Sequence, residues 1–166
     1  MSGAARPGRA ASPGGRIGLV SDTHGLLRPS VLTFLEGCKL IVHGGDIGGS
    51  AVLHELARLA PLIAVRGNND AAADSAHLRE RELVDVEDVR LFVIHDRSHI
   101  DADLHAMGVR VVVYGHSHRP SMEEIDGILY VNPGSAGPRR FKLPIAAGEL
   151  QVSGRSVKAR IVDFDE

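Results

Sequence analysis

The sequence predicts an α/β fold in which two mixed β-sheets pack face to face as a sandwich flanked by helices (αββα). In the first half, short apolar runs of strand length alternate with helical patterns, as they do in parallel βαβ crossovers. The second half is mainly a succession of short β segments. The chain has 166 residues and no internal repeat, so we expect a single domain over residues 16–166.

Residues 1–15 have a different composition, rich in Gly, Ala, Pro and Arg, with almost nothing to bury. We expect them to form a disordered extension, since they also lack the apolar core of a secretory signal. No apolar stretch approaches the roughly 20 residues that a membrane span needs. The net charge of −2 gives no reason to expect a membrane surface or a nucleic acid as a stable partner. Cys38 is the single cysteine, which fits a reducing compartment, and we expect a cytoplasmic protein.

The first half begins with a buried strand and continues with alternating helices and strands. The apolar runs predict strands over residues 17–20, 40–43 and 62–65. Pro29 is expected to open the first helix and Gly37 to end it. Ser50 is expected to cap a second helix, whose apolar residues follow helical spacing.

The second half predicts strands almost throughout. They are expected over residues 82–86, 90–95, 109–114, 121–125, 128–131, 145–152 and 156–162. Between the second and third of these strands, a short helix is expected over residues 104–107.

Short polar clusters follow several of the predicted strands. They are Asp22-Thr23-His24, Gly45-Asp46, Gly67-Asn68, His95 and Gly115-His116-Ser117-His118. Ligand sites in such sheets lie at the carboxyl ends of the strands. Taken singly, each cluster also fits a turn, a helix cap or a structural histidine. Together they supply enough carboxylate, amide and imidazole groups to hold two metal ions side by side.

These blocks resemble those of the calcineurin-like metallophosphoesterases. The resemblance rests on Val20–Gly25, His43–Asp46, Val65–Asp70 and Tyr114–His118, and it runs from about Ile17 to the C-terminus. Asn132-Pro133-Gly134-Ser135 is similar to a block of their small bacterial and archaeal branch, the YfcE-like phosphodiesterases.

The resemblance implies a dinuclear metal centre. The first ion would be held by Asp22, His24, Asp46 and His118, and the second by Asp46, Asn68, His95 and His116, with Asp46 bridging. It also implies direct attack on phosphorus by a hydroxide that bridges the two ions, so Asp46, Asn68 and His116 count as catalytic. The donor set without thiolate suits Mn²⁺, with Fe, Co, Ni or Zn as alternatives.

Three positions depart from the family pattern. Asn69 stands where larger relatives carry a histidine thought to protonate the leaving group, which favours substrates with good leaving groups. His95-Asp96-Arg97 replaces a common His-Gly-His, and Arg97 is expected either to bind substrate phosphate or to be solvated. Arg139-Arg140 is expected either to bind a second phosphate or to contact the C-terminal strands.

The resulting hypothesis is a metal-dependent phosphodiesterase that acts on a small-molecule phosphate ester or diester. Asp70 is a further candidate, expected to orient His116 or His24. The alternatives are a phosphomonoesterase and a protein-binding scaffold like the retromer subunit of this superfamily, whose metal site is incomplete. A homodimer through an edge strand is also expected from the resemblance.

Overall fold

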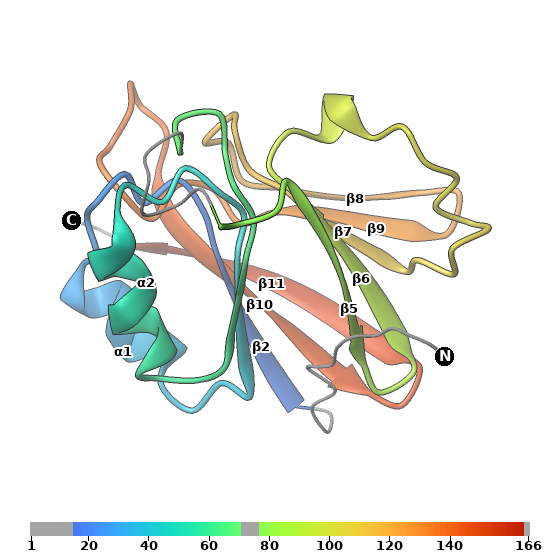
Figure 1. Cartoon of the computed structure of the whole chain (residues 1–166). Helices are drawn as coiled ribbons and strands as arrows, with labels where there is room; N and C mark the ends of the chain where they lie inside the picture. Colours follow the sequence, from blue (N-terminus) through green and yellow to red (C-terminus); the bar gives the residue numbers. More distant parts are fainter. Residues whose placement is uncertain (1–14, 71–76, 165–166) are drawn as a thin grey trace.

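The computed structural model describes residues 15–70 and 77–164, which form two five-stranded sheets (Figure 1). The first sheet, in the order β11-β10-β2-β3-β4, contains β2 (Gly15–Val20), β3 (Leu40–His43), β4 (Leu62–Ala64), β10 (Ile145–Ser153) and β11 (Ser156–Phe164). The second, in the order β5-β6-β7-β9-β8, contains β5 (Arg81–Val86), β6 (Val89–Ile94), β7 (Val111–Val113), β8 (Ser121–Ile125) and β9 (Ile128–Asn132). Apart from Gly15, the predicted N-terminal extension lies outside the described residues.

Both sheets are mixed, as predicted. β2, β3 and β4 run parallel in the first sheet, where β10 and β11 are antiparallel to their neighbours. β6, β7 and β9 run parallel in the second sheet, where β5 and β8 are antiparallel. Each sheet therefore has three neighbouring parallel strands, whose carboxyl ends share one edge of that sheet.

The main core lies between the sheets and follows the two-residue period of the strands. Ile17 and Leu19 on β2 are fully buried there, and Leu91 and Val93 on β6 face them from the second sheet. The intervening residues on β2 and β6 face outward. They are also apolar or small because each sheet is covered on its outer side.

Two helices cover the outer face of the first sheet, α1 (Pro29–Leu35) and α2 (Ser50–Ala57) (Figure 1). Leu35 and Leu56 are fully buried and belong to the cluster that includes Ile41 of β3. Pro29 is the first residue of α1, as predicted. The predicted cap by Ser50 is wrong, because Gly49 is the N-cap residue of α2 and Ser50 is already helical.

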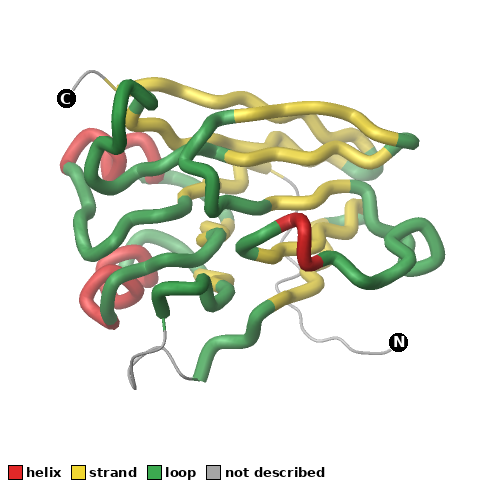
Figure 2. Tube along the Cα trace, turned by 90° about the horizontal axis from the view of Figure 1, so that it is seen from above, coloured by secondary structure: helices red, strands yellow, loops and turns green. Residues whose placement is uncertain are grey.

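The second sheet is covered differently from the prediction. Within residues 95–110 the structure has a 3₁₀ turn, η2 (Arg97–His99), and hydrogen-bonded turns over residues 104–108, but no α-helix. The predicted helix over 104–107 is wrong, because four residues close only a single turn before Gly108 adopts a left-handed conformation. In Figure 2 the two α-helices lie together on one side, away from η2. Leu104 and Val109 still cover Phe92, so this coil performs the packing expected of a helix.

No helix among the described residues is long and apolar enough to cross a membrane.

Candidate metal centre

The predicted ligands all leave the ends of parallel strands from both sheets. Asp22 and His24 follow β2, Asp46 follows β3 and Asn68 follows β4. His95 follows β6, and the pair His116 and His118 follows β7. Side chains from the two sheets come within 4 Å of one another, so the loops after these strands converge on one place.

The first group of donor atoms surrounds Asp22 Oδ1. His118 Nε2 lies 3.4 Å from this oxygen and His24 Nε2 lies 3.8 Å from it. The His24 and His118 rings are stacked with their centroids 5.3 Å apart. This trio is one of the two sets of acidic and histidine side chains that the described residues offer to a metal ion. It matches three of the four ligands expected for the first ion.

The second group consists of Asp22, Asp46 and His95. His95 Nε2 lies 3.4 Å from Asp46 Oδ2 and 3.9 Å from Asp22 Oδ1. Asp46 Oδ2 is also 3.8 Å from His24 Nε2, so this oxygen lies within reach of a histidine from each predicted set. The His95 ring contacts the His116 ring edge-on at 5.2 Å. Asp22 belongs to both groups, which the sequence did not predict.

The chemistry of these atoms fits metal ions. The Gly44 carbonyl can only accept a hydrogen bond, so His95 Nδ1, 2.7 Å away, is the donor, and in the neutral ring Nε2 carries a lone pair. That lone pair faces two carboxylates that are also acceptors. Asp22 Oδ1, His24 Nε2 and His95 Nε2 are buried without a hydrogen-bond partner among the described residues. Donors on one ion at about 2.0–2.2 Å lie roughly 2.8–3.6 Å apart, close to the spacing seen here.

The backbone conformation of the ligand loops is unusual. Among the described residues, eight non-glycine residues have a positive φ, and five of them are predicted ligands. These five are Asp22, His24, Asp46, His116 and His118. A left-handed conformation costs L residues on the order of 1–3 kcal/mol and persists where the surrounding structure imposes it. Its concentration here indicates that these loops are shaped to aim side chains at a common centre.

Glycines let the loops approach the carboxylates. A Cβ on Gly67 would lie within 3 Å of the Asp46 carboxylate, and a Cβ on Gly115 would lie 2.7 Å from Asp22 Oδ2. The glycine that precedes Asn68 and the one that precedes His116 are therefore required by the contact between loops of different strands.

Side chains around the two carboxylates fix their orientation. Asn69 donates two hydrogen bonds to Asp46, from its backbone N–H to Oδ1 at 2.9 Å and from its side chain to Oδ2 at 3.0 Å. Ser21 Oγ donates to Asp22 Oδ2 at 2.7 Å, and Ser135 Oγ donates to the Asp22 carbonyl. Ser21 and Ser135 were not singled out by the sequence as partners of Asp22, although Ser135 belongs to the Asn132–Ser135 block.

Asp70 does not orient a histidine through any hydrogen bond among the described residues, contrary to the prediction. Its Oδ1 accepts from the backbone N–H of Ile47 at 2.9 Å, and its Oδ2 accepts from Gly67 N–H at 2.9 Å. Asp70 is almost fully buried. It ties the loop that carries Asp46 to the loop that carries Asn68, and a sequence pattern cannot show which backbone amides a carboxylate will meet.

Arg97 does not bind at the metal centre, and it is not simply solvated. Its Nη1 lies 2.7 Å from Glu123 Oε1, and its guanidinium covers the rings of Tyr114 and Tyr130 at 5.2 and 4.5 Å. Arg97 therefore packs on the outer face of the second sheet. These contacts do not support the phosphate role considered for Arg97, which stays a prediction.

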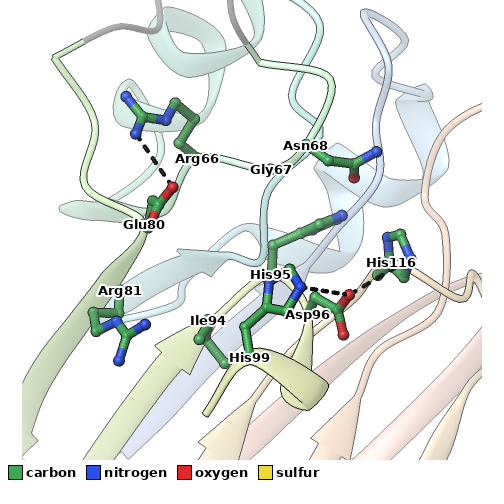
Figure 3. A pocket seen from close by; sticks show the side chains of 10 residues that line it. All are labelled: Arg66, Gly67, Asn68, Glu80, Arg81, Ile94, His95, Asp96, His99 and His116. Carbon is green, nitrogen blue, oxygen red and sulfur yellow. Dashed lines mark ion pairs between the residues drawn. The ribbon is translucent and has the colours of Figure 1, made fainter. Parts of the chain in front are cut away.

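A pocket lies beside the second group of donors (Figure 3). It is lined by Arg66, Gly67, Asn68, Glu80, Arg81, Ile94, His95, Asp96, His99 and His116. Three of these, Asn68, His95 and His116, are the residues expected to hold the second ion together with Asp46. Asp96 was missed as a site residue. His99 was not counted as one either, although its proximity to His95 in the sequence placed it within reach of the pocket mouth.

The electrostatics of the centre show how its charges depend on one another. Burial raises the pKa of Asp22 above its usual value. Burial acts in the same direction on Asp46, but the His95 ring and the hydrogen bonds from Asn69 outweigh it and hold the pKa of Asp46 well below its usual range. Burial alone would lower the pKa of His95, but Asp46 and Asp22 raise it. The centre thus draws positive charge toward His95, and a divalent cation satisfies the same demand.

An α/β sandwich with histidines and carboxylates clustered at strand ends is typical of metal-dependent hydrolases. Residues 16–154 match the calcineurin-like phosphoesterase superfamily domain, and the chain belongs to this family. The resemblance drawn from the sequence is confirmed.

Similar proteins come from archaea, bacteria and eukaryotes. A protein of Methanocaldococcus jannaschii named as a probable metallophosphoesterase is 33% identical over 163 residues, which cover 90% of this chain and 82% of its own. The phosphodiesterase YfcE of Escherichia coli is 34% identical over 169 residues, covering 87% and 91%. The solved structure of Vps29 from Chaetomium thermophilum superposes with a TM-score of 0.74 at 18% identity, covering 90% of this chain and 96% of its own, which shows a shared fold.

Replacing Asp70 by Ala should destabilise the protein strongly. The amides of Ile47 and Gly67 would be left buried without an acceptor, which costs about 1–3 kcal/mol each. We expect the free energy of unfolding in urea to fall by roughly 2–6 kcal/mol, with Asp70→Asn intermediate because it keeps one acceptor. Asp163→Ala, at an exposed position of β11, is the matched control. An Asp70→Ala protein as stable as the control would contradict this role.

His43 should make the metal-free protein sensitive to acid. Burial lowers the pKa of His43 from 6.5 to about 3, since its ring is enclosed between Thr23 Oγ1 and Gly45 N–H. The unfolded chain binds a proton near pH 6.5 that the folded chain does not, so stability is lost as the pH falls from 6.5 toward 3. We expect about 1.4 kcal/mol per pH unit in this window. Urea unfolding of chelator-treated protein at several pH values measures the slope, and a His43→Gln variant should show a smaller one.

Proposed function

We propose that this protein is a dinuclear metal-dependent phosphodiesterase. The observation that supports it most is that Asp46 Oδ2 lies within 4 Å of a histidine from each predicted ligand set, His24 and His95. A bridging carboxylate is what two neighbouring cations require, because it offsets their repulsion. Proteins named phosphodiesterase are similar in sequence to this chain.

The proposed ligand sets are those expected from the sequence. Asp22, His24, Asp46 and His118 would hold the first ion, and Asp46, Asn68, His95 and His116 the second. Bound there, the ions would supply an activated water as nucleophile and would neutralise charge on the phosphoryl oxygens. We propose Mn²⁺ as the ion, with Fe, Co, Ni or Zn as alternatives for the same donors.

The chain's own groups would position the substrate around this centre. Asn68 and His116 are both exposed where the pocket opens beside His95, so they are accessible to a phosphate ester. Besides the proposed metal ions, Arg140 would supply positive charge near the substrate. Burial lowers the pKa of His118 and the charge of Arg140 acts in the same direction, so that charge reaches the centre. Arg139 instead donates to the Leu143 carbonyl within its own loop.

The scaffold alternative is less well supported. The Vps29 structures similar to this chain are less than 25% identical to it and indicate the fold alone. All seven expected ligand residues are present here at their strand ends. A cytoplasmic location and a homodimer through an edge strand stay predictions. Among the edge strands of the described residues, β8 carries exposed Met122 and Ile125, and β5 carries exposed Leu83.

Replacing Asp46 by Ala should remove both metal ions, because it removes the group shared by both sets. Replacing Asn68 by Ala should mainly weaken the second ion. After loading with Mn²⁺ and desalting, elemental analysis should find close to two ions in wild type, close to none in Asp46→Ala and about one in Asn68→Ala. Asp88→Ala, exposed in the turn between β5 and β6, is the control. Two ions retained by Asp46→Ala would sink the ligand assignment.

The activity is tested by hydrolysis of bis(p-nitrophenyl) phosphate and p-nitrophenyl phosphate by metal-stripped protein, with and without Mn²⁺. We expect turnover that depends on the metal and is faster on the diester. Faster cleavage of the monoester would favour the phosphomonoesterase. If folded protein turned over neither ester with any divalent metal, the scaffold alternative would replace this proposal.

A further inference from the structure

The residues proposed for the reaction so far do not include a proton donor for the leaving group. When the ester bond breaks, the departing oxygen is a poor leaving group unless it receives a proton. Asn69, at the position where larger relatives carry a histidine, has no acidic proton, and its side-chain amide already donates to Asp46 at 3.0 Å. Any proton donor must therefore come from elsewhere in the pocket.

The charged and titratable side chains that line the pocket leave one suitable group. His95 and His116 are proposed metal ligands, while Arg66 and Arg81 do not release protons at neutral pH. Glu80 is paired with Arg66 at 3.5 Å. Asp96 is engaged as an acceptor, because its Oδ1 accepts hydrogen bonds from the backbone N–H and the Oγ of Ser98. His99 remains, with its side chain 71% exposed to solvent.

Asp96 is held in a fixed orientation toward His99. Its Oδ1 accepts two hydrogen bonds from Ser98, from the backbone N–H at 3.0 Å and from Oγ at 2.7 Å. Its Oδ2 is left to face two imidazoles, His99 Nε2 at 3.6 Å and His116 Nε2 at 3.8 Å. Figure 3 shows Asp96 between these two rings. Both contacts are ion-pair distances that are longer than a hydrogen bond.

We propose that His99 is the general acid of the reaction and that Asp96 is its positioning residue. The inference rests on the proposed function. As the bond between phosphorus and the leaving oxygen breaks, that oxygen keeps the electron pair and takes a proton from the His99 imidazolium. The neutral ring regains a proton from water. The carboxylate of Asp96 faces Nε2 at 3.6 Å and attracts the imidazolium toward the side of the pocket where His116 meets the proposed second ion.

The test compares two substrates of the Mn²⁺-loaded protein that differ only in the leaving group, methyl p-nitrophenyl phosphate and methyl phenyl phosphate. Nitrophenolate leaves readily without a proton, whereas phenolate gains more from one. In His99→Gln we expect kcat for the phenyl ester to fall about 10²-fold or more, and the ratio of the nitrophenyl to the phenyl rate to rise at least tenfold. KM for both esters and the bound Mn²⁺ measured by elemental analysis should stay near wild type.

Variants of Asp96 and a remote histidine separate positioning from general damage. Asp96→Asn should raise the same ratio by a smaller factor, and Asp96→Glu should restore part of it. His105→Gln, exposed in the turn over residues 104–108, should leave both rates and the ratio unchanged.

The alternatives give distinct results. If His99→Gln lowered both rates by the same factor, or neither, then His99 would not be the proton donor. If its Mn²⁺ content fell along with both rates, His99 would act on the metal centre and the inference would also fail. Wild-type protein that cleaves neither ester would overturn the proposed function, and this inference with it.

Discussion

Two buried carboxylates that face the same imidazoles are the constraint on which the site depends. Asp22 is fully buried and Asp46 nearly so, and each lies within 4 Å of both His24 and His95. Anions in such surroundings are costly unless positive charge lies between them. Two pKa shifts reflect this need for positive charge. Burial raises the pKa of Asp22. Burial would lower the pKa of His95, but Asp46 and Asp22 raise it.

The fold holds these groups together through hydrogen bonds that join different loops. Asp70 joins the loops after β3 and β4, and His43 joins Thr23, after β2, to Gly45, after β3. Ser135, after β9, bonds the carbonyl of Asp22, after β2, and so connects the two sheets. Assembly of the centre is therefore coupled to assembly of the sandwich. The left-handed backbone at several ligands is tolerated because partners in other loops impose it.

The strands and the polar clusters at their ends could be predicted from the sequence because both depend on local patterns, whereas the division of these side chains into two ligand sets rested on the family resemblance. An apolar run ending in a polar cluster predicts a buried strand and, by the parallel arrangement, a common place for its last side chains. The roles of Asp70 and Arg97 did not follow, since they depend on partners such as Gly67 N–H and Glu123 whose proximity is a result of packing. The prediction of Ser50 as the N-cap of α2 was wrong because Gly and Ser are both acceptable N-cap residues, and the helix begins one residue earlier than expected.

The segment between β6 and β7 differs from the predicted fold and also from the family's sequence pattern. A helix here would continue from the strand end and direct its side chains onto the second sheet. Instead the chain makes the η2 turn, with Asp96 as its N-cap through Ser98. Arg97 then points to the tyrosines on the outer face of the sheet, while Asp96 and His99 line the pocket. Asp96-Arg97 stands in place of the family's Gly-His. Arg97 packs on the sheet, whereas Asp96 lines the pocket. The carboxylate of Asp96, beside the proposed ligand His95, faces His99 at the pocket.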